Sequence, residues 1–189
     1  MKLSRVSKIL LLSANIWYFG EGMLGPLFAV FAEKVGGDIL DITWAWSTYL
    51  VVTGLVYIIT GKLLNKKPYK AHVMVIGYAI NALFTFGYLF VRSPMQLFFV
   101  QAGLGVAEAI GTPAWDALFA KNLTEEHDSY GWGLSTGQSQ IVTGISFGIG
   151  GLITHFMSFE VLFITMGCVQ VLATIMASRL LNAGIKKND

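Results

Sequence analysis

The sequence predicts an all-α membrane protein with six transmembrane helices, arranged as two inverted three-helix repeats in a single domain over residues 1–189. Its 189 residues are 54% hydrophobic and only 13% charged, whereas an average soluble domain carries about 25% charged residues. The apolar residues form long blocks, each close to the ~20 residues that a membrane-spanning helix needs. Several polar, glycine and proline positions of the first half recur in the second.

The six predicted spans are 6–32, 44–64, 72–91, 95–119, 132–156 and 159–181. The first follows a basic N-terminus and resembles a signal peptide, but it continues past Phe28 without a typical cleavage site, so we interpret it as a retained helix. The fifth contains Gln138 and Gln140, and its assignment depends on the apolar run that follows them. A stripe of small residues in this span predicts close helix packing. The stripe consists of Gly137, Gly144, Gly148 and Gly151.

The distribution of lysine and arginine predicts that both termini are cytoplasmic. Eleven of the thirteen Lys and Arg residues lie near the two ends of the chain and in the connections after spans two and four. Only Lys34 and Arg92 lie on the opposite side. Because such an excess marks the cytoplasmic side, we expect a multi-pass protein of the cytoplasmic (inner) membrane, with the lipid bilayer as its first partner.

An internal repeat relates residues of about 6–91 to residues of about 95–181. Glu21 and Pro26 recur as Glu108 and Pro113, both at an offset of 87 residues. Further matches follow in the same order at offsets of 88 to 90: Trp44, Ser47 and Thr48 with Trp132, Ser135 and Thr136; Val52, Thr53, Gly54, Gly61 and Gly77 with Val142, Thr143, Gly144, Gly151 and Gly167. Because each unit holds three spans, the second copy enters from the opposite side, which is typical of transporter folds.

Two acidic residues lie near the centres of predicted spans, Glu21 in the first and Glu108 in the fourth. A charge at mid-bilayer costs about 2.5–3.5 kcal/mol on insertion scales, so such a residue should face the bundle interior or water, or be protonated. Both are therefore candidates for proton or substrate coupling. The alternative is a neutral carboxyl that hydrogen-bonds a neighbouring helix. Nearby polar and aromatic candidates are Gln101, Trp17, Tyr18, Trp115 and Asn15.

Each of these glutamates precedes a proline by five residues. Proline cannot donate to the carbonyl four residues back and disturbs the helix there. Irregular backbone at membrane depth is tolerated where it lines a cavity, so we expect kinks beside the two acids. The predicted kink residues are Gly22, Pro26, Gly111 and Pro113.

Several functional classes are not indicated. The single cysteine, Cys168, cannot form an intrachain disulfide, and the net charge of +2 does not suggest a nucleic-acid partner. The sequence contains no nucleotide-binding loop, metal-ligand cluster or hydrolytic triad. We therefore expect no enzyme, no catalytic residue, no metal and no cofactor.

The segment after the second span resembles the cytoplasmic loop signature of the major facilitator superfamily. Gly61, Leu63, Lys66 and Lys70 match that signature in kind, while Asn65 stands in place of its usual aspartate. Other parts of the chain are similar to the superfamily as well, with Phe99 where its fourth helix has an arginine. These parts are Gly103, Gly105 and 113–118 in span four, and Gly144, Gly148, Gly150 and Gly151 in span five.

The resemblance implies one six-helix half of a twelve-helix fold, in which helices one and four line a central cavity and helices two and five face the other half. It implies a secondary active transporter that moves a small solute by alternating access, with proton coupling as an option. The loop would act as a conformational latch, with Lys66 pairing Asp116. A homodimer, or a heterodimer with another half, would complete the cavity. Two alternatives remain open: a non-transporting assembly or lipid-binding protein, and a passive channel.

Cysteine labelling tests the predicted topology. Single cysteines at Asp38, Ser93 and Ser158 should react with membrane-impermeant reagents from outside, because they lie in the poorly basic connections. Cysteines at Lys67 and Thr124 should react only after the cytoplasmic side is exposed. Labelling of the Lys67 position in intact cells would overturn the orientation.

Overall fold

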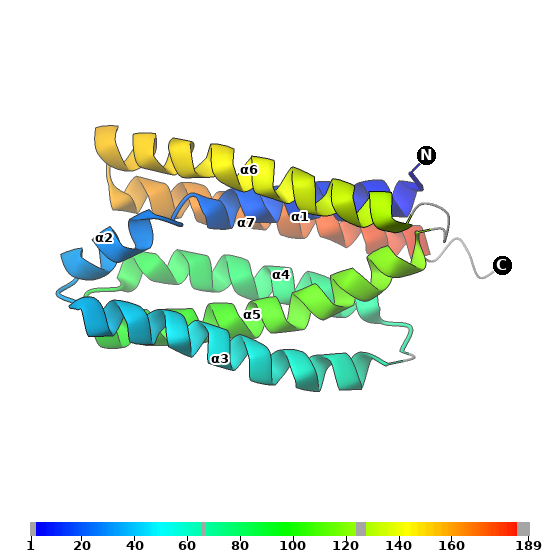
Figure 1. Ribbon diagram of the computed structural model, residues 1–189, viewed down its shortest axis with the longest axis horizontal. Coiled ribbons are helices and arrows are strands. Elements are labelled where there is room, and N and C mark those ends of the chain that lie inside the picture. The colour runs from blue at the N-terminus through cyan, green and yellow to red at the C-terminus, as the bar shows by residue number, and fades with distance from the viewer. Residues whose placement is uncertain (1–2, 66, 124–127, 185–189) are drawn as a thin grey trace.

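The computed structural model describes residues 3–65, 67–123 and 128–184. In these ranges the chain forms seven α-helices and one short 3-10 helix, and no strand (Figure 1). The helices are α1 (Arg5–Gly22), α2 (Leu27–Lys34), α3 (Ile39–Leu64), α4 (Lys70–Gly87), η1 (Tyr88–Phe90), α5 (Pro94–Lys121), α6 (Asp128–Phe156) and α7 (Phe159–Gly184). The all-α class that the sequence predicts is confirmed.

Four of these helices are long and apolar enough to cross a membrane: α3, α4 with η1, α5 and α7. They correspond to the second, third, fourth and sixth predicted spans. The first predicted span is divided between α1 and α2, and α1 carries three charged residues, Arg5, Lys8 and Glu21. The fifth corresponds to α6, which is rich in serine, threonine, glutamine and glycine. The number of six spans stays a prediction.

The helices form two layers that meet through α4 and α7. In one layer α5 lies between α3 and α4, and in the other α1 lies between α6 and α7 (Figure 1). The main pairings map onto one another when α1 is exchanged with α5, α3 with α6 and α4 with α7, although α6 also touches α7 and the corresponding pair α3 and α4 does not pack in this way. Each layer therefore combines two helices from one predicted repeat with one from the other.

Two clusters of buried apolar side chains fill the ends of the bundle. The first surrounds α2, where Phe31 packs edge-on against Phe163 at 4.7 Å between ring centroids, and Phe163 stacks on Tyr88 at 5.1 Å. The second includes Leu10, Phe119 and their neighbours at the end where α1 begins and α7 ends. Because lipid is as apolar as these side chains, close packing rather than hydrophobic transfer holds such helices together.

The two predicted kinks differ. Residues 23–26 form a turn between α1 and α2, in which backbone amides donate to the carbonyl three residues back. The Leu24 amide donates to the Glu21 carbonyl at 3.3 Å, and the Gly25 amide donates to the Gly22 carbonyl at 3.1 Å. Pro26 precedes the first residue of α2. Pro113, by contrast, lies inside the continuous helix α5, as does Gly111.

The closest contact between α1 and α6 involves Gly22 and Gly150. A Cβ atom at Gly22 would lie 2.0 Å from the hydroxyl of Ser146, and one at Gly150 would lie 2.0 Å from the carbonyl oxygen of Met23. Within one chain the predicted glycine stripe makes no close helix contact, because a Cβ at any of its four members meets nothing within 4 Å. Those four lie on the side of α6 turned away from α1, whereas Gly150 faces it.

This contact generates a stability prediction with a matched control on the same helix. Gly150→Ala should destabilise the protein by roughly 1–3 kcal/mol, because the added methyl meets backbone and forces α6 away from the α1–α2 turn. Gly148→Ala should be neutral or stabilising by up to about 1 kcal/mol, because helix propensity rises where space is open. Thermal unfolding in detergent, followed by tryptophan fluorescence, measures both. Equal midpoints for the two variants would contradict this packing.

Candidate functional site

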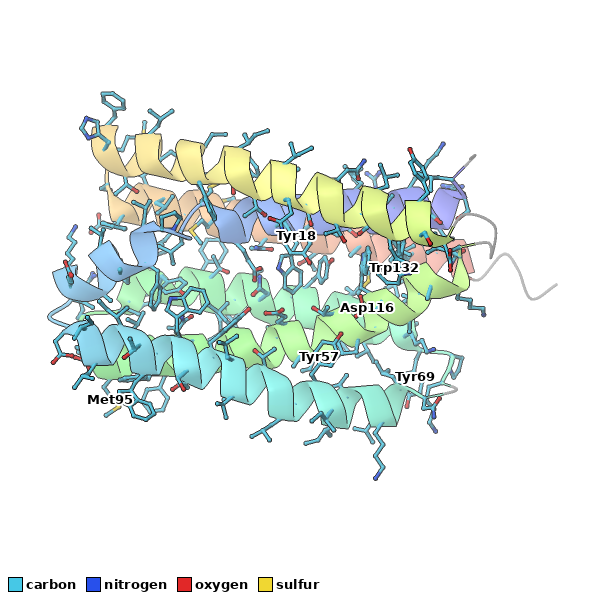
Figure 2. All side chains as sticks on the ribbon, viewed as in Figure 1. Tyr18, Tyr57, Tyr69, Met95, Asp116 and Trp132 are labelled. Carbon is cyan, nitrogen blue, oxygen red and sulfur yellow. The ribbon has the colours of Figure 1, made fainter. Side chains whose placement is uncertain are left out.

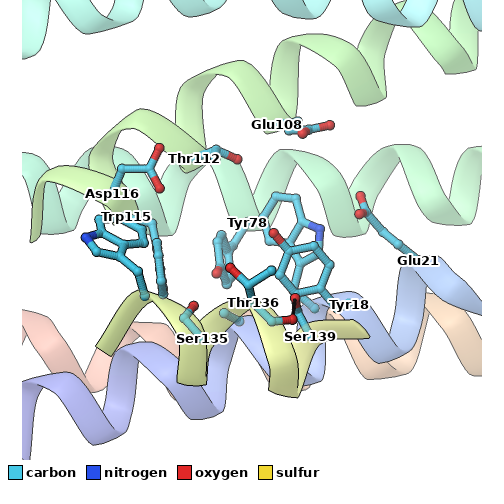
Figure 3. Close-up of a pocket in the computed structure, with 13 residues that line it drawn as sticks. Tyr18, Glu21, Tyr78, Glu108, Thr112, Trp115, Asp116, Ser135, Thr136 and Ser139 are labelled. Carbon is cyan, nitrogen blue, oxygen red and sulfur yellow. Dashed lines mark hydrogen bonds between the residues drawn. The ribbon is translucent and has the colours of Figure 1, made fainter. Parts of the chain in front are cut away.

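A cavity of about 210 Å³ lies among α1, α5 and α6, with Tyr78 of α4 in its wall (Figure 3). Its lining combines three acidic residues, five aromatic residues, four serine or threonine residues and one alanine. The lining residues are Ala14, Trp17, Tyr18, Glu21, Tyr78, Glu108, Thr112, Trp115, Asp116, Trp132, Ser135, Thr136 and Ser139.

One face of α5 presents a row of polar side chains to this cavity. Glu108, Thr112 and Asp116 follow at intervals of four residues, so they lie one helical turn apart on the same side. Figure 3 shows these three side chains across the cavity from the hydroxyl groups of α6. The row brings two carboxyls together with the third, Glu21, which lies at the end of α1.

Tyrosine hydroxyls from α3 hold the two carboxyls of α5. Tyr49 donates a hydrogen bond to Glu108, and Tyr57 donates one to Asp116 at 2.6 Å. Both pairs have the same sequence separation of 59 residues, which follows because α3 and α5 run parallel in this bundle. Figure 2 shows Tyr57 and Asp116 close together between the two helices. A buried carboxyl that accepts such a bond keeps a fixed orientation.

Aromatic rings form the other walls. Trp17 packs edge-on against Tyr78, with 4.1 Å between ring centroids. The indole N–H of Trp115 donates to the Leu10 carbonyl of α1 at 3.0 Å, which ties α5 to α1 beside the cavity. Trp132 of α6 packs edge-on against Trp115 at 6.3 Å. The rings are therefore held by contacts with one another and by the bond from Trp115 to Leu10.

A second cavity of about 110 Å³ lies on the other side of Glu21, beside the turn between α1 and α2. Its polar lining includes Gln101, which accepts a hydrogen bond from Tyr88 at 3.0 Å, and Tyr49, the partner of Glu108. Glu21 lines both cavities. Glu21 therefore lies at the boundary between a cavity toward one end of the bundle and a cavity toward the other, while Glu108 lines the larger cavity and is joined to the smaller through Tyr49.

The predicted site residues are distributed over three places. The larger cavity contains Glu21, Glu108, Trp17, Tyr18 and Trp115, and the smaller contains Gln101. Asn15 lies apart from both, because its side-chain amide donates to Gln138 of α6 at 3.1 Å and joins those two helices.

The loop residues lie at the end of α3 and the start of α4. Gly61 and Leu63 are exposed in the last turns of α3, Asn65 caps that helix, and Lys70 is the first residue of α4. Lys66 lies outside the described residues, and so does its predicted pairing with Asp116. The Asp116 carboxyl itself lines the cavity and accepts a hydrogen bond from the Tyr57 hydroxyl.

Sequence reasoning did not include several residues that form this site. Tyr49 and Tyr57 are eight residues apart in the second predicted span, and Glu108 and Asp116 have the same spacing in the fourth. This match in spacing could have indicated two tyrosine–carboxyl pairs between the spans. Thr112 completes the polar row on α5. The serine and threonine side chains of α6 were used only as repeat matches, yet Ser135, Thr136 and Ser139 share one face of that helix and line the cavity.

Among the residues that the structure describes, no group of three or more histidine, cysteine, aspartate or glutamate side chains is placed to hold a metal ion. The family model described as Major Facilitator Superfamily matches residues 10–188, almost the whole chain. A search of curated proteins finds no match.

Proposed function

Because the chain belongs to the major facilitator superfamily over residues 10–188, we propose that it is a secondary active transporter that moves a small solute by alternating access, coupled to protons through Glu21 and Glu108. Members of this superfamily are transporters rather than enzymes. The observation that supports the proposal is the position of the two carboxyls, which come from different helices and line one cavity, with Glu21 also lining a second cavity.

A carboxyl in this position suits a proton-coupled cycle. An isolated charge inside a membrane protein is expensive, so an uncompensated carboxylate takes up a proton. A group that can reach one cavity in one conformation and the other cavity in another can then load on one side and release on the other. Glu21 lies at the end of α1, next to the turn at residues 23–26. A turn of this kind can absorb the backbone rotation that such a change requires.

The packing of the helices supports an inverted repeat of three plus three spans. The main helix pairings map onto one another after exchange of α1 with α5, α3 with α6 and α4 with α7. Two residues related by the predicted repeat, Thr53 and Thr143, also lie against glycines of the exchanged helices, Thr53 against Gly105 of α5 and Thr143 against Gly22 of α1. These two glycines are not themselves repeat partners, so the correspondence holds between helices rather than between individual contacts.

The start of α1 and the end of α7 lie at the same end of the bundle (Figure 1), which agrees with an even number of crossings. With the excess of Lys and Arg at that end, we place both termini in the cytoplasm and the protein in the inner membrane. The larger cavity then lies toward the cytoplasmic side and the smaller one toward the outside.

A passive channel fits less well. Apolar clusters with closely packed rings fill both ends of the bundle, around Phe31 and Phe163 at one end and around Phe119 at the other. Such clusters occupy the two ends of the bundle, beyond the two cavities. A pathway through the bundle would need rearrangement of the helices, which is the property of a transporter.

Neutral replacement of the two acids tests proton coupling. Glu21→Gln and Glu108→Gln should abolish solute accumulation driven by a pH gradient, because the amide keeps the size and polarity of the side chain but cannot bind a transferable proton. Exchange of solute without a gradient should continue in the Glu21→Gln variant. Proteoliposomes with and without a pH gradient, loaded with candidate solutes, provide the measurement.

The control is Glu33→Gln, an exposed acid of α2 that lines neither cavity, and it should behave as the unmodified protein. Full gradient-driven accumulation by the Glu21→Gln/Glu108→Gln variant would reduce these residues to structural roles. Absence of any exchange by the unmodified protein would favour the assembly or lipid-binding alternative.

We further propose that the cavity is completed by a second six-helix unit, as a parallel homodimer, with a heterodimer as the alternative. This proposal is supported by exposed apolar side chains on α3 and α6, the helices on either side of the polar row. Val51 at the middle of α3 is 56% exposed and Ile141 at the middle of α6 is 66% exposed. Lipid cannot satisfy polar groups that lie between these helices, whereas a second copy related by a twofold axis can.

Crosslinking tests this assembly. In a Cys168→Ser background, Val51→Cys together with Ile141→Cys should give a disulfide between identical chains in native membranes, because a twofold axis brings α3 of one copy to α6 of the other. Leu83→Cys, on the exposed face of α4, should remain uncrosslinked. A protein that stays monomeric while transporting in bilayers would exclude the homodimer.

A further inference from the structure

The larger cavity contains a chemical pattern that proton coupling does not require. Two carboxyls would suffice for a proton pair, yet Asp116 adds a third, and five aromatic rings surround them. None of the thirteen described residues that line the cavity is lysine, arginine or histidine. The lining is therefore acidic and aromatic, without an internal cation to balance it.

We propose that this cavity binds a small organic cation, whose ammonium group lies between the carboxylates of Glu108 and Asp116 and whose apolar part lies against the aromatic walls. This substrate class rests on the proposed transport function for its biological meaning, although binding can be measured without transport.

A cationic ligand would compensate the negative charge of the carboxylates. Carboxylates in a low-dielectric site attract a cation far more strongly than in water, and they repel an anion. A neutral solute would leave them without a counter-charge. Aromatic faces add to the preference, because the negative face of a ring attracts an ammonium or quaternary ammonium group.

The geometry gives each side of the cavity a separate role. Tyr49 and Tyr57 reach Glu108 and Asp116 from α3 and orient both carboxyls, whose remaining lone pairs are available to a ligand. Thr112 lies between the two acids on α5, so the polar row offers three acceptors in sequence. Across the cavity, α6 presents the hydroxyl groups of Ser135, Thr136 and Ser139 (Figure 3), which can accept from further N–H groups.

The size of the cavity limits the ligand. The part of it within one chain has a volume of about 210 Å³, below the ~300–1,000 Å³ typical of drug-sized pockets. A compact amine with one ring, or a small quaternary ammonium ion, fits this description better than a large amphiphile.

The test uses a matched series of ligands on the intact purified protein. The series is 2-phenylethylamine (a cation), phenyltrimethylammonium (a permanent cation without N–H donors), 2-phenylethanol (neutral) and 3-phenylpropanoate (an anion). Three of the five tryptophans, Trp17, Trp115 and Trp132, line the cavity, so intrinsic fluorescence reports occupancy. Both cations should bind at least about tenfold more tightly than the neutral compound, and the anion least of all.

Variants then locate the binding. Asp116→Asn should lower the affinity for both cations by about tenfold or more, because the substitution removes a charged partner. The affinity for 2-phenylethanol should stay unchanged. Glu108→Gln provides a second variant at the site. Glu33→Gln, outside both cavities, should bind all four compounds as the unmodified protein does. If Asp116→Asn does not fold, the ligand series on the unmodified protein decides.

The outcomes separate this inference from the transport function. Equal affinity for the cations and 2-phenylethanol, or no binding of either cation, overturns the inference. Transport of a neutral or anionic solute by a protein that binds no cation overturns it as well, while leaving the transporter assignment intact. Selective cation binding by a protein that transports nothing supports this inference and contradicts the proposed transport function.

Discussion

The inability of a bilayer to solvate a carboxyl group is the constraint on which this structure depends. Glu21, Glu108 and Asp116 all lie within the helical bundle, where lipid offers no hydrogen-bond donor. Their partners must come from other helices, and Tyr49 and Tyr57 on α3 supply them for the two acids of α5. This requirement fixes the register of α3 against α5, and the same face of α5 presents the polar row toward the hydroxyl groups of α6.

A similar sequence pattern leads to different backbone structure in the two related helices. Glu21 and Pro26 surround a turn that separates α1 from α2, whereas Pro113 lies within the continuous helix α5. The neighbours differ at these points. On α5, the backbone of Gly111 lies against Gly77 of α4, where an added Cβ would come within 2.6 Å of it, and this contact supports the helix around the proline. Because of this asymmetry, a turn follows Glu21 at the end of α1, whereas the polar row lies on the continuous helix α5.

The function and the substrate class depend on different observations. Membership of the major facilitator superfamily indicates transport, and the position of Glu21 between two cavities supports proton coupling. The organic cation follows from the remainder of the lining, in which carboxyl and aromatic groups occur without a basic residue. A proton and an organic cation would then use neighbouring carboxyls in one cavity, so binding of one can influence the other through charge alone.

The sequence by itself determined the membrane class, the superfamily and the two central glutamates, because a charged residue within a long apolar block is conspicuous whatever the tertiary arrangement. The tertiary structure alone decided which side chains meet. It placed Asp116 in the cavity beside Tyr57, joined Asn15 to Gln138, and made Gly150 rather than the predicted stripe the contact with α1. The physical reason is helix rotation. An apolar helix in a membrane has no strongly amphipathic pattern to show which face is buried, so the facing residues become known only when the helices are packed.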